Sequence, residues 1–143
     1  MFLGTHPVKL DDKGRLFLPA RFREELSGGI VVTKGQERCL FVFKATDFET
    51  QATKLSDAPV TGKVLRDFSR VLFASASGEV PDRQGRITVP AMLRSFAGLA
   101  KECVVIGANT RLEIWGAAAW ATYEAEQEQV FAEQAEEVLP GVF

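Results

Sequence analysis

The stretches DDKGRLFLPARFR, from Asp11 to Arg23, and DRQGRITVPAMLR, from Asp82 to Arg94, are two versions of one sequence. Six aligned residues are identical: Asp11/Asp82, Gly14/Gly85, Arg15/Arg86, Pro19/Pro90, Ala20/Ala91 and Arg23/Arg94. Three further pairs exchange one apolar residue for another: Leu16/Ile87, Leu18/Val89 and Phe22/Leu93. Agreement this dense between two segments of one chain indicates an internal repeat. We therefore treat the chain as two related halves.

Each copy predicts a strand, a tight turn, a second strand and a short helix. Leu16 and Leu18 stand on one face of the second strand, since side chains alternate along a strand. Gly14 places the turn, because glycine adopts a positive φ without steric cost. Pro19 ends the strand and suits the first turn of the helix that follows, over residues 20–26.

The remainder of each half follows a common plan. In the first half two buried strands are expected at 29–33 and 39–44, followed by a helix to about residue 55. The segment Thr46 to Glu49 matches a capping box at the start of that helix. In the second half two strands flank a turn at 108–110, and a helix is expected from about Ala117 to Val138.

The predicted fold class is α+β, mainly β. A repeat of about 70 residues is marginal as a domain, so the two copies are expected to share one core. Two copies with four short strands each predict a small β-barrel flanked by helices. We expect residues 1–58 to form the first repeat, 59–73 a connecting helix, and 74–143 the second repeat with its C-terminal helix.

Charge is unevenly distributed along a chain whose net charge is −2. Five basic residues and two acids lie between Lys9 and Arg23, whereas six acids and no bases lie between Glu124 and Glu137. The basic N-terminal segment is compatible with nucleic-acid binding in spite of the net charge. The acidic segment predicts a solvated helix face, a surface for a partner, or a surface that repels DNA from the wrong side of the protein.

Other function classes have little support in the sequence. The chain has one histidine, His6, and lacks a nucleophile elbow, a phosphate loop and a dinucleotide fingerprint. Its two cysteines, Cys39 and Cys103, lie in apolar runs typical of buried positions. No Cys/His cluster, signal peptide or apolar run of about 20 residues is present. We therefore predict a cytoplasmic protein without enzymatic activity, cofactor, metal, membrane contact or small-molecule substrate.

The repeated Asp-x-x-x-Arg turn has two interpretations. In the structural one, Asp11 accepts backbone hydrogen bonds, Gly14 bends the chain, and Arg15 pairs with the Asp. An exposed pair of this kind contributes only about 0–1 kcal/mol to stability. In the functional one, the Asp positions the arginine, whose planar fork grips a guanine edge or a phosphate, and a two-stranded ribbon enters the major groove.

The functional interpretation names nine candidate residues. Arg15 and Arg86 are the predicted DNA-reading side chains. Lys13, Arg83 and Lys9 are predicted to neutralise phosphates. Asp11, Gly14, Asp82 and Gly85 are predicted to organise the two turns. The turns are not equivalent in charge, because the first reads DDKGR and the second DRQGR.

The sequence strongly resembles the MraZ proteins, bacterial regulators associated with the division and cell-wall gene cluster. The resemblance runs nearly end to end, and its most specific marks are the two Asp-x-x-x-Arg motifs at 11–15 and 82–86. The repeated unit also resembles AbrB-type DNA-binding proteins. These resemblances imply a pseudo-twofold barrel of swapped-hairpin, double-psi-like type made of two AbrB-like repeats. They also imply a nucleoid-associated regulator, a repressor of its own cluster, that forms homo-oligomeric rings on promoter direct repeats.

A rival interpretation comes from the same resemblance. Some AbrB-like proteins are antitoxins that bind a toxin through a C-terminal segment, and their DNA contact serves only autoregulation. On that interpretation the acidic segment from Glu124 to Glu137 is the partner surface. Its helical pattern argues against it, because antitoxin tails are usually disordered.

Overall fold

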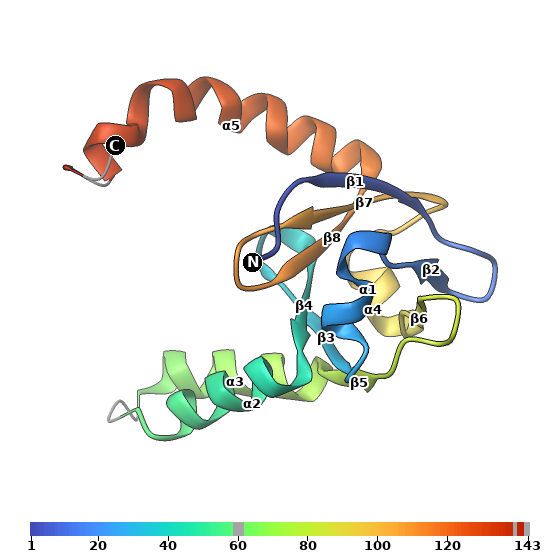
Figure 1. Ribbon diagram of the computed structural model, residues 1–143. Coiled ribbons are helices and arrows are strands. Elements are labelled where there is room, and N and C mark those ends of the chain that lie inside the picture. Colours follow the sequence, from blue (N-terminus) through green and yellow to red (C-terminus); the bar gives the residue numbers. More distant parts are fainter. Residues whose placement is uncertain (59–61, 139, 142–143) are drawn as a thin grey trace.

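The strand, turn, strand and short helix predicted for each repeat are present in both halves of the computed structural model. The structure describes residues 1–58, 62–138 and 140–141 (Figure 1). The first unit comprises β1 (Thr5–Lys9), β2 (Arg15–Phe17), the 3-10 turn η1 (Ala20–Phe22) and α1 (Arg23–Leu26). The second comprises β5 (Ser77–Glu79), β6 (Arg86–Thr88) and α4 (Ala91–Phe96). The repeated sequence therefore encodes a repeated local structure.

A β-hairpin and a helix follow each unit. The first half continues with β3 (Ile30–Lys34), the 3-10 turn η2 (Gln36–Arg38), β4 (Leu40–Lys44), α2 (Ala45–Ser56) and α3 (Lys63–Ser75). The second half continues with β7 (Glu102–Gly107), β8 (Leu112–Gly116) and α5 (Ala117–Val138). The predicted bounds of α5 are confirmed. The connecting helix was expected from residue 59, and residues 59–61 lie outside the described part of the chain.

The capping box predicted at Thr46 is wrong. α2 begins at Ala45, directly after β4, and its N-cap is Lys44, which makes no side-chain capping bond. Thr46 therefore lies inside the first turn of the helix rather than before it. The backbone N–H of Ala45 donates to the carbonyl of Gly29 instead, so a neighbouring loop satisfies one of the first amides.

Strands are exchanged between the repeats in an antiparallel sheet with the order β1-β7-β8-β4-β3-β5. β1 of the first repeat pairs with β7 of the second, and β5 of the second pairs with β3 of the first. β4 and β8 join the two hairpins at the centre. Replacing every strand by its counterpart in the other repeat leaves this set of pairs unchanged. The pairing therefore has approximate twofold symmetry, and neither repeat can complete its sheet alone.

A separate two-stranded ribbon joins the two copies of the repeated unit. β2 and β6 pair antiparallel, and the central pair is Leu16 with Ile87. Both of these side chains are buried, as are Leu18 and Val89, the apolar residues directly after each strand. They pack into one core with residues of the sheet and the short helices, including Leu26, Val32, Leu93, Val105 and Ile114. The ribbon is therefore anchored by one face and exposed on the other.

The expected closed barrel is not found. The six-stranded sheet is open, because β1 and β5 form its two ends and are not paired with each other. β2 uses one edge to pair with β6, and its other edge makes only an isolated bridge, Leu10 with Leu16, to the end of β1. The strands that could have closed the sheet instead bond to each other in the ribbon.

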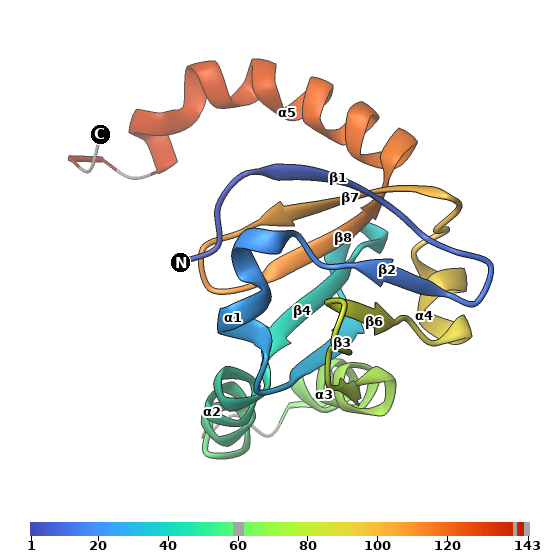
Figure 2. The same cartoon turned by 45° about the vertical axis from the view of Figure 1, so that its right-hand side comes forward.

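Helices cover two opposite ends of the molecule. α2 and α3 lie side by side at one end, and α5 lies at the other end, beyond β1 and β7 (Figures 1 and 2). The rings of Phe48 on α2 and Phe73 on α3 are 5.9 Å apart. The first turns of α5 are anchored by Trp120, whose ring lies 5.3 Å from that of Trp115 on β8. Within the described residues, none of the helices is both long enough and apolar enough to cross a bilayer.

Candidate nucleic-acid interface

The first turn is organised around the carboxylate of Asp11. One oxygen, Oδ1, accepts hydrogen bonds from the backbone N–H groups of Lys13 and Arg15, both at 2.9 Å. The other, Oδ2, accepts a bond of 2.8 Å from Nε of Arg15. Among the described residues, nothing accepts a hydrogen bond from the two terminal nitrogens of Arg15. The Asp therefore fixes the guanidinium through its inner edge and leaves the outer edge available.

The second turn repeats this arrangement atom by atom. Oδ1 of Asp82 accepts from the backbone N–H groups of Gln84 and Arg86 at 2.9 Å. Oδ2 of Asp82 accepts from Nε of Arg86 at 2.7 Å. The same geometry at two sites shows that both Asp residues hold their turns together. It also means that the chain presents two guanidinium groups in the same way.

Each turn is supported by an arginine of the other repeat. Gly14 and Gly85 have φ angles of 77° and 80°, which favour glycine. Arg94 of the second repeat lies against Gly14 and donates to the carbonyl of Val89. Arg23 of the first repeat lies against Gly85 and donates from Nε to the carbonyl of Leu18 at 3.1 Å. The two turns are therefore interlocked rather than independent.

The exposed face of the ribbon carries four side chains: Arg15, Phe17, Arg86 and Thr88. The two arginine side chains are 31% and 25% exposed, and Phe17 is 48% exposed. Because Arg15 pairs with Thr88 and Arg86 with Phe17, the arginines stand diagonally, about 7 Å apart along the strands. β2 and β6 lie side by side in Figure 2. The ribbon therefore presents two cations on one narrow surface.

The remaining predicted residues surround this face unequally. Lys13 and Arg83 are exposed and lie within the first and second turns. Lys9 is also exposed, but it lies at the end of β1, paired with Glu102 of β7. An acid at the neighbouring position reduces the attraction that Lys9 can exert on a phosphate. The structure thus brings four of the five predicted cations to the ribbon and its turns.

Three residues of this surface were missed by sequence reasoning. Arg23 and Arg94 are an identical pair of the repeat, and that identity was the signal that could have found them. Phe17 had no such signal, because its counterpart is Thr88. The guanidinium carbons of Arg23 and Arg86 are each 6.0 Å from the centre of the Phe17 ring. This contact makes the second turn chemically different from the first.

Hydrogen bonding stabilises the ionised form of both turn carboxylates. The backbone N–H of Arg15 is the main cause that lowers the pKa of Asp11 below its ordinary value of 3.8, although partial desolvation acts in the opposite direction. The backbone N–H of Arg86 does the same for the pKa of Asp82. A carboxylate that accepts several N–H bonds is expected to behave in this way. Both turns are therefore held by charged acceptors at neutral pH.

Acid is expected to weaken the turns at a pH below the ordinary value for aspartate. Because the pKa of each Asp is lower in the folded than in the unfolded chain, the stabilising effect is complete above the unfolded value. It is lost as the pH falls through the folded value. Carbon-13 NMR titration of the carboxyl groups should give midpoints below 3.8 for Asp11 and Asp82. Midpoints at or above 3.8 would contradict the hydrogen-bonding pattern.

The described residues contain no cluster of three or more His, Cys, Asp or Glu side chains that could hold a metal ion. Both cysteines are buried, as predicted. Burial is the main cause that raises the pKa of Cys103 to about 11, which keeps its thiol protonated and unreactive. Among the described residues, the groups available for binding are therefore the two arginines held by aspartates and the exposed turns around them.

Comparison with known proteins identifies the chain's relatives. A family model described as "MraZ protein, putative antitoxin-like" matches residues 1–71 and again residues 72–140. The chain belongs to the MraZ family. The two matched segments correspond to the two structural repeats, so the family's own unit is the repeat described above.

Several curated members of the family resemble this chain over almost their whole length. A protein of Thermobifida fusca (strain YX) named "Transcriptional regulator MraZ" is 70% identical over 99% of both chains. Proteins of the same name from Parafrankia sp. (strain EAN1pec) and Frankia casuarinae are 66% and 64% identical, again over 99% of both chains. These MraZ proteins are named as regulators of transcription and not as enzymes.

Proposed function

We propose that this chain is a sequence-specific DNA-binding transcriptional regulator, and that Arg15 and Arg86 read the DNA. The observation that carries the proposal is the position of these two arginines on the exposed face of the β2–β6 ribbon. Each is held through Nε by an Asp and has its terminal nitrogens unbonded among the described residues. A guanidinium oriented in this way is suited to bidentate contact with O6 and N7 of guanine.

The shape of the ribbon supports insertion into the major groove. Two antiparallel strands fit this groove, which is about 12 Å wide. Phe17 lies directly across the ribbon from Arg86 and offers an apolar surface to a thymine methyl group. Since Thr88 occupies the corresponding place beside Arg15, the two halves of the ribbon would contact different bases. The protein is therefore proposed to recognise an asymmetric element, as a direct repeat requires.

Lys13, Arg83 and Lys9 are proposed to bind phosphates. Lys13→Ala is expected to weaken binding to all DNA sequences alike and to reduce the slope of log K against log salt by about 0.9, the effect of one lost phosphate contact. Electrophoretic mobility shifts at several salt concentrations measure this slope. Thr110→Ala, an exposed change on the loop between β7 and β8, is the control and should leave the slope unchanged. A loss confined to one sequence would instead assign Lys13 to base reading.

The assembled form proposed here is a homo-oligomer, arranged as a ring, that occupies promoter direct repeats of the division and cell-wall cluster. The weak contacts of one ribbon per chain gain affinity when several chains bind together. Within each chain we propose a first repeat at 1–58, a connecting helix at 59–73 and a second repeat with its C-terminal helix at 74–143. The proposed site of action is the cytoplasm, on the nucleoid. Footprinting on the DNA upstream of the chain's own gene tests the proposal directly.

The antitoxin-like alternative has one argument in its favour, the wording of the family description. The ordered α5, which continues as a helix from Ala117 to Val138, speaks against it. Purification from the native host separates the two proposals. A second protein in fixed stoichiometry that is released by changes in α5 would support the alternative. A chain that purifies without a second protein and binds DNA specifically would support a regulator.

A further inference from the structure

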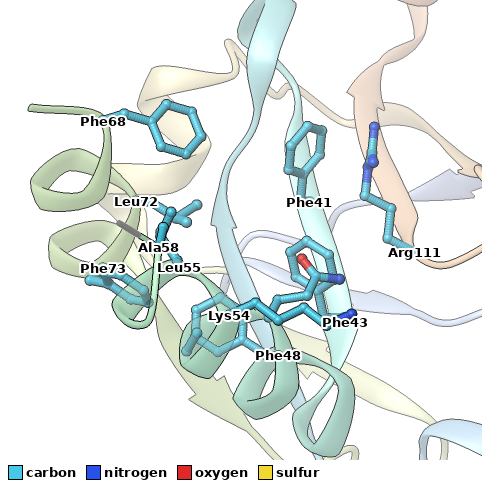
Figure 3. A pocket seen from close by; sticks show the side chains of 12 residues that line it. Phe41, Phe43, Phe48, Lys54, Leu55, Ala58, Phe68, Leu72, Phe73 and Arg111 are labelled. Carbon is cyan, nitrogen blue, oxygen red and sulfur yellow. The ribbon is translucent and has the colours of Figure 1, made fainter. Parts of the chain in front are cut away.

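An apolar groove of about 410 Å³ lies between β4 and the α2–α3 pair. Phe68 on α3 faces Phe41 on β4 across this groove (Figure 3). Phe68 is 47% exposed, although a phenyl ring is more stable when buried. The residues that line the groove include two bases, Lys54 and Arg111, and no acid. The groove therefore offers an apolar floor with a positively charged edge.

The outer half of α5 has the opposite charge and exposes apolar side chains. The described side chains from 125 to 134 are all exposed, so this part of the helix extends beyond the body of the protein. Phe131 and Val138 are seven residues apart, about two turns, and share one face of the helix. They are 74% and 63% exposed. Between Glu124 and Glu137 the helix carries six acids and no base.

An uncovered helix of this kind is unstable by itself. Most of a helix's stability in a protein comes from packing one of its faces against other elements, and the described side chains from 125 to 134 are exposed. Glu124 and Glu128 are four residues apart, and like charges at that spacing are destabilising. In the first repeat the corresponding helix, α2, is covered by α3, as the contact of Phe48 with Phe73 shows. Among the described residues, no helix covers α5 in this way. Comparison of the two repeats therefore indicates that α5 lacks a covering helix equivalent to α3.

The required surface is present on the same chain, at the opposite end of the molecule. Its charged groups are Lys54 on α2 and Arg111, which precedes β8 and pairs with Glu113 at 2.7 Å. α5 and the α2–α3 pair occupy opposite ends in both Figure 1 and Figure 2, so α5 as described cannot fill the groove of its own chain. A second copy can supply either partner.

We propose that the acidic outer half of α5 docks into the α2–α3 groove of a second copy of this chain. Phe131 and Val138 would cover the apolar floor at Phe68, and glutamates of α5 would lie against Lys54 and Arg111, the two bases that line the groove. Because two different surfaces meet, each subunit has one donor end and one acceptor end. Such a contact is heterologous, and repeated head to tail it closes into a ring if the rotation permits. This inference names the contact for the oligomer proposed above.

Two single variants test the contact by measurement of mass in solution. Phe131→Asp damages the donor helix, and Phe68→Glu damages the acceptor groove; both positions are exposed, so folding should be preserved. The wild-type chain is expected to be oligomeric by size exclusion with light scattering. Each variant alone should be a monomer of 15.7 kDa. A monomeric wild type, or variants with the wild-type mass, would overturn the proposal.

An equimolar mixture of the two variants gives the sharper result. The intact α5 of the Phe68→Glu chain can enter the intact groove of the Phe131→Asp chain, but no further chain can be added. The mixture should therefore form a one-to-one dimer. A mixture that stays monomeric would show that α5 and the groove do not meet. Met92→Asp, which changes an exposed apolar residue on α4, is the matched control and should keep the wild-type mass.

The outcome is separable from that of the DNA proposal. The Arg15→Ala/Arg86→Ala chain should keep the oligomeric mass and lose specific DNA binding. The Phe131→Asp chain should have the mass of a monomer. It should keep the weak DNA binding of a single subunit, because its ribbon is unchanged. If the prediction on DNA binding fails, the prediction on oligomeric mass can still hold, and the reverse is also true.

Discussion

Replacement of both Arg15 and Arg86 by alanine is expected to abolish sequence-specific DNA binding. A bidentate contact between arginine and a base contributes about 1–3 kcal/mol to discrimination. Loss of two such contacts should therefore weaken specific binding at least about 30-fold for one subunit, and further in an oligomer. A mobility-shift titration with the native upstream DNA and a scrambled duplex measures the effect. Non-specific binding should persist, because Lys13 and Arg83 are retained.

The control for this experiment removes positive charge elsewhere. Arg21 is exposed on η1, outside both turns, so Arg21→Ala should alter specific binding little. The single variants Arg15→Ala and Arg86→Ala should each lose part of the specific affinity for DNA. The difference between the two losses measures the influence of Phe17 on the second turn. Unchanged specificity in the double variant would show that the Asp-x-x-x-Arg unit is only a structural turn.

Gly14→Ala is expected to destabilise the protein strongly. An alanine Cβ at this position would overlap a terminal nitrogen of Arg94, and φ is 77°. The left-handed backbone costs about 1–2 kcal/mol for a non-glycine residue. Displacement of Arg94 also breaks its hydrogen bond to Val89, a charged bond worth about 1.5–3 kcal/mol. The free energy of unfolding should fall by about 2.5–5 kcal/mol, measured by denaturant titration.

Substitutions at two other glycines distinguish the cost of backbone strain from the cost of steric overlap. Gly98 has a φ of 60° and no atom within 4 Å of the place that an alanine Cβ would take, so Gly98→Ala should show the cost of backbone strain alone. Gly28 has neither a positive φ nor a close neighbour, so Gly28→Ala should be neutral or slightly stabilising. Gly85→Ala should resemble Gly14→Ala, because Arg23 occupies the same place there. A Gly14→Ala chain as stable as Gly98→Ala would show that Arg94 moves aside without cost.

Local structure could be predicted from the sequence because local patterns encode it. The Gly-bent turns, the strands around them and the long α5 follow from glycine at positive φ, alternating apolar residues and helical spacing. The capping box at Thr46 failed because β4 runs directly into α2, and a loop carbonyl at Gly29 took the place of a side-chain cap. The pattern was present, but tertiary contacts determined where the helix began.

The pairing of strands could not be predicted in the same way. Nothing in the local sequence of β1 specifies β7 as its partner, and the number of short strands suggested a closed barrel that is not found. At the candidate site, sequence identity between repeats identified both arginines and both Asp residues. The importance of Phe17 depends on which residue lies across the ribbon, and only the pairing with Arg86 reveals it.

The exchange of strands also imposes an order of events on biosynthesis. Thr5 pairs with Ile106, so β1 leaves the ribosome about a hundred residues before its partner is made. At about 5–20 residues per second, this interval lasts roughly 5–20 s. During that time the first strands expose unpaired edges that invite aggregation. We therefore expect the nascent chain to aggregate more readily than the complete chain until its final third has been synthesised.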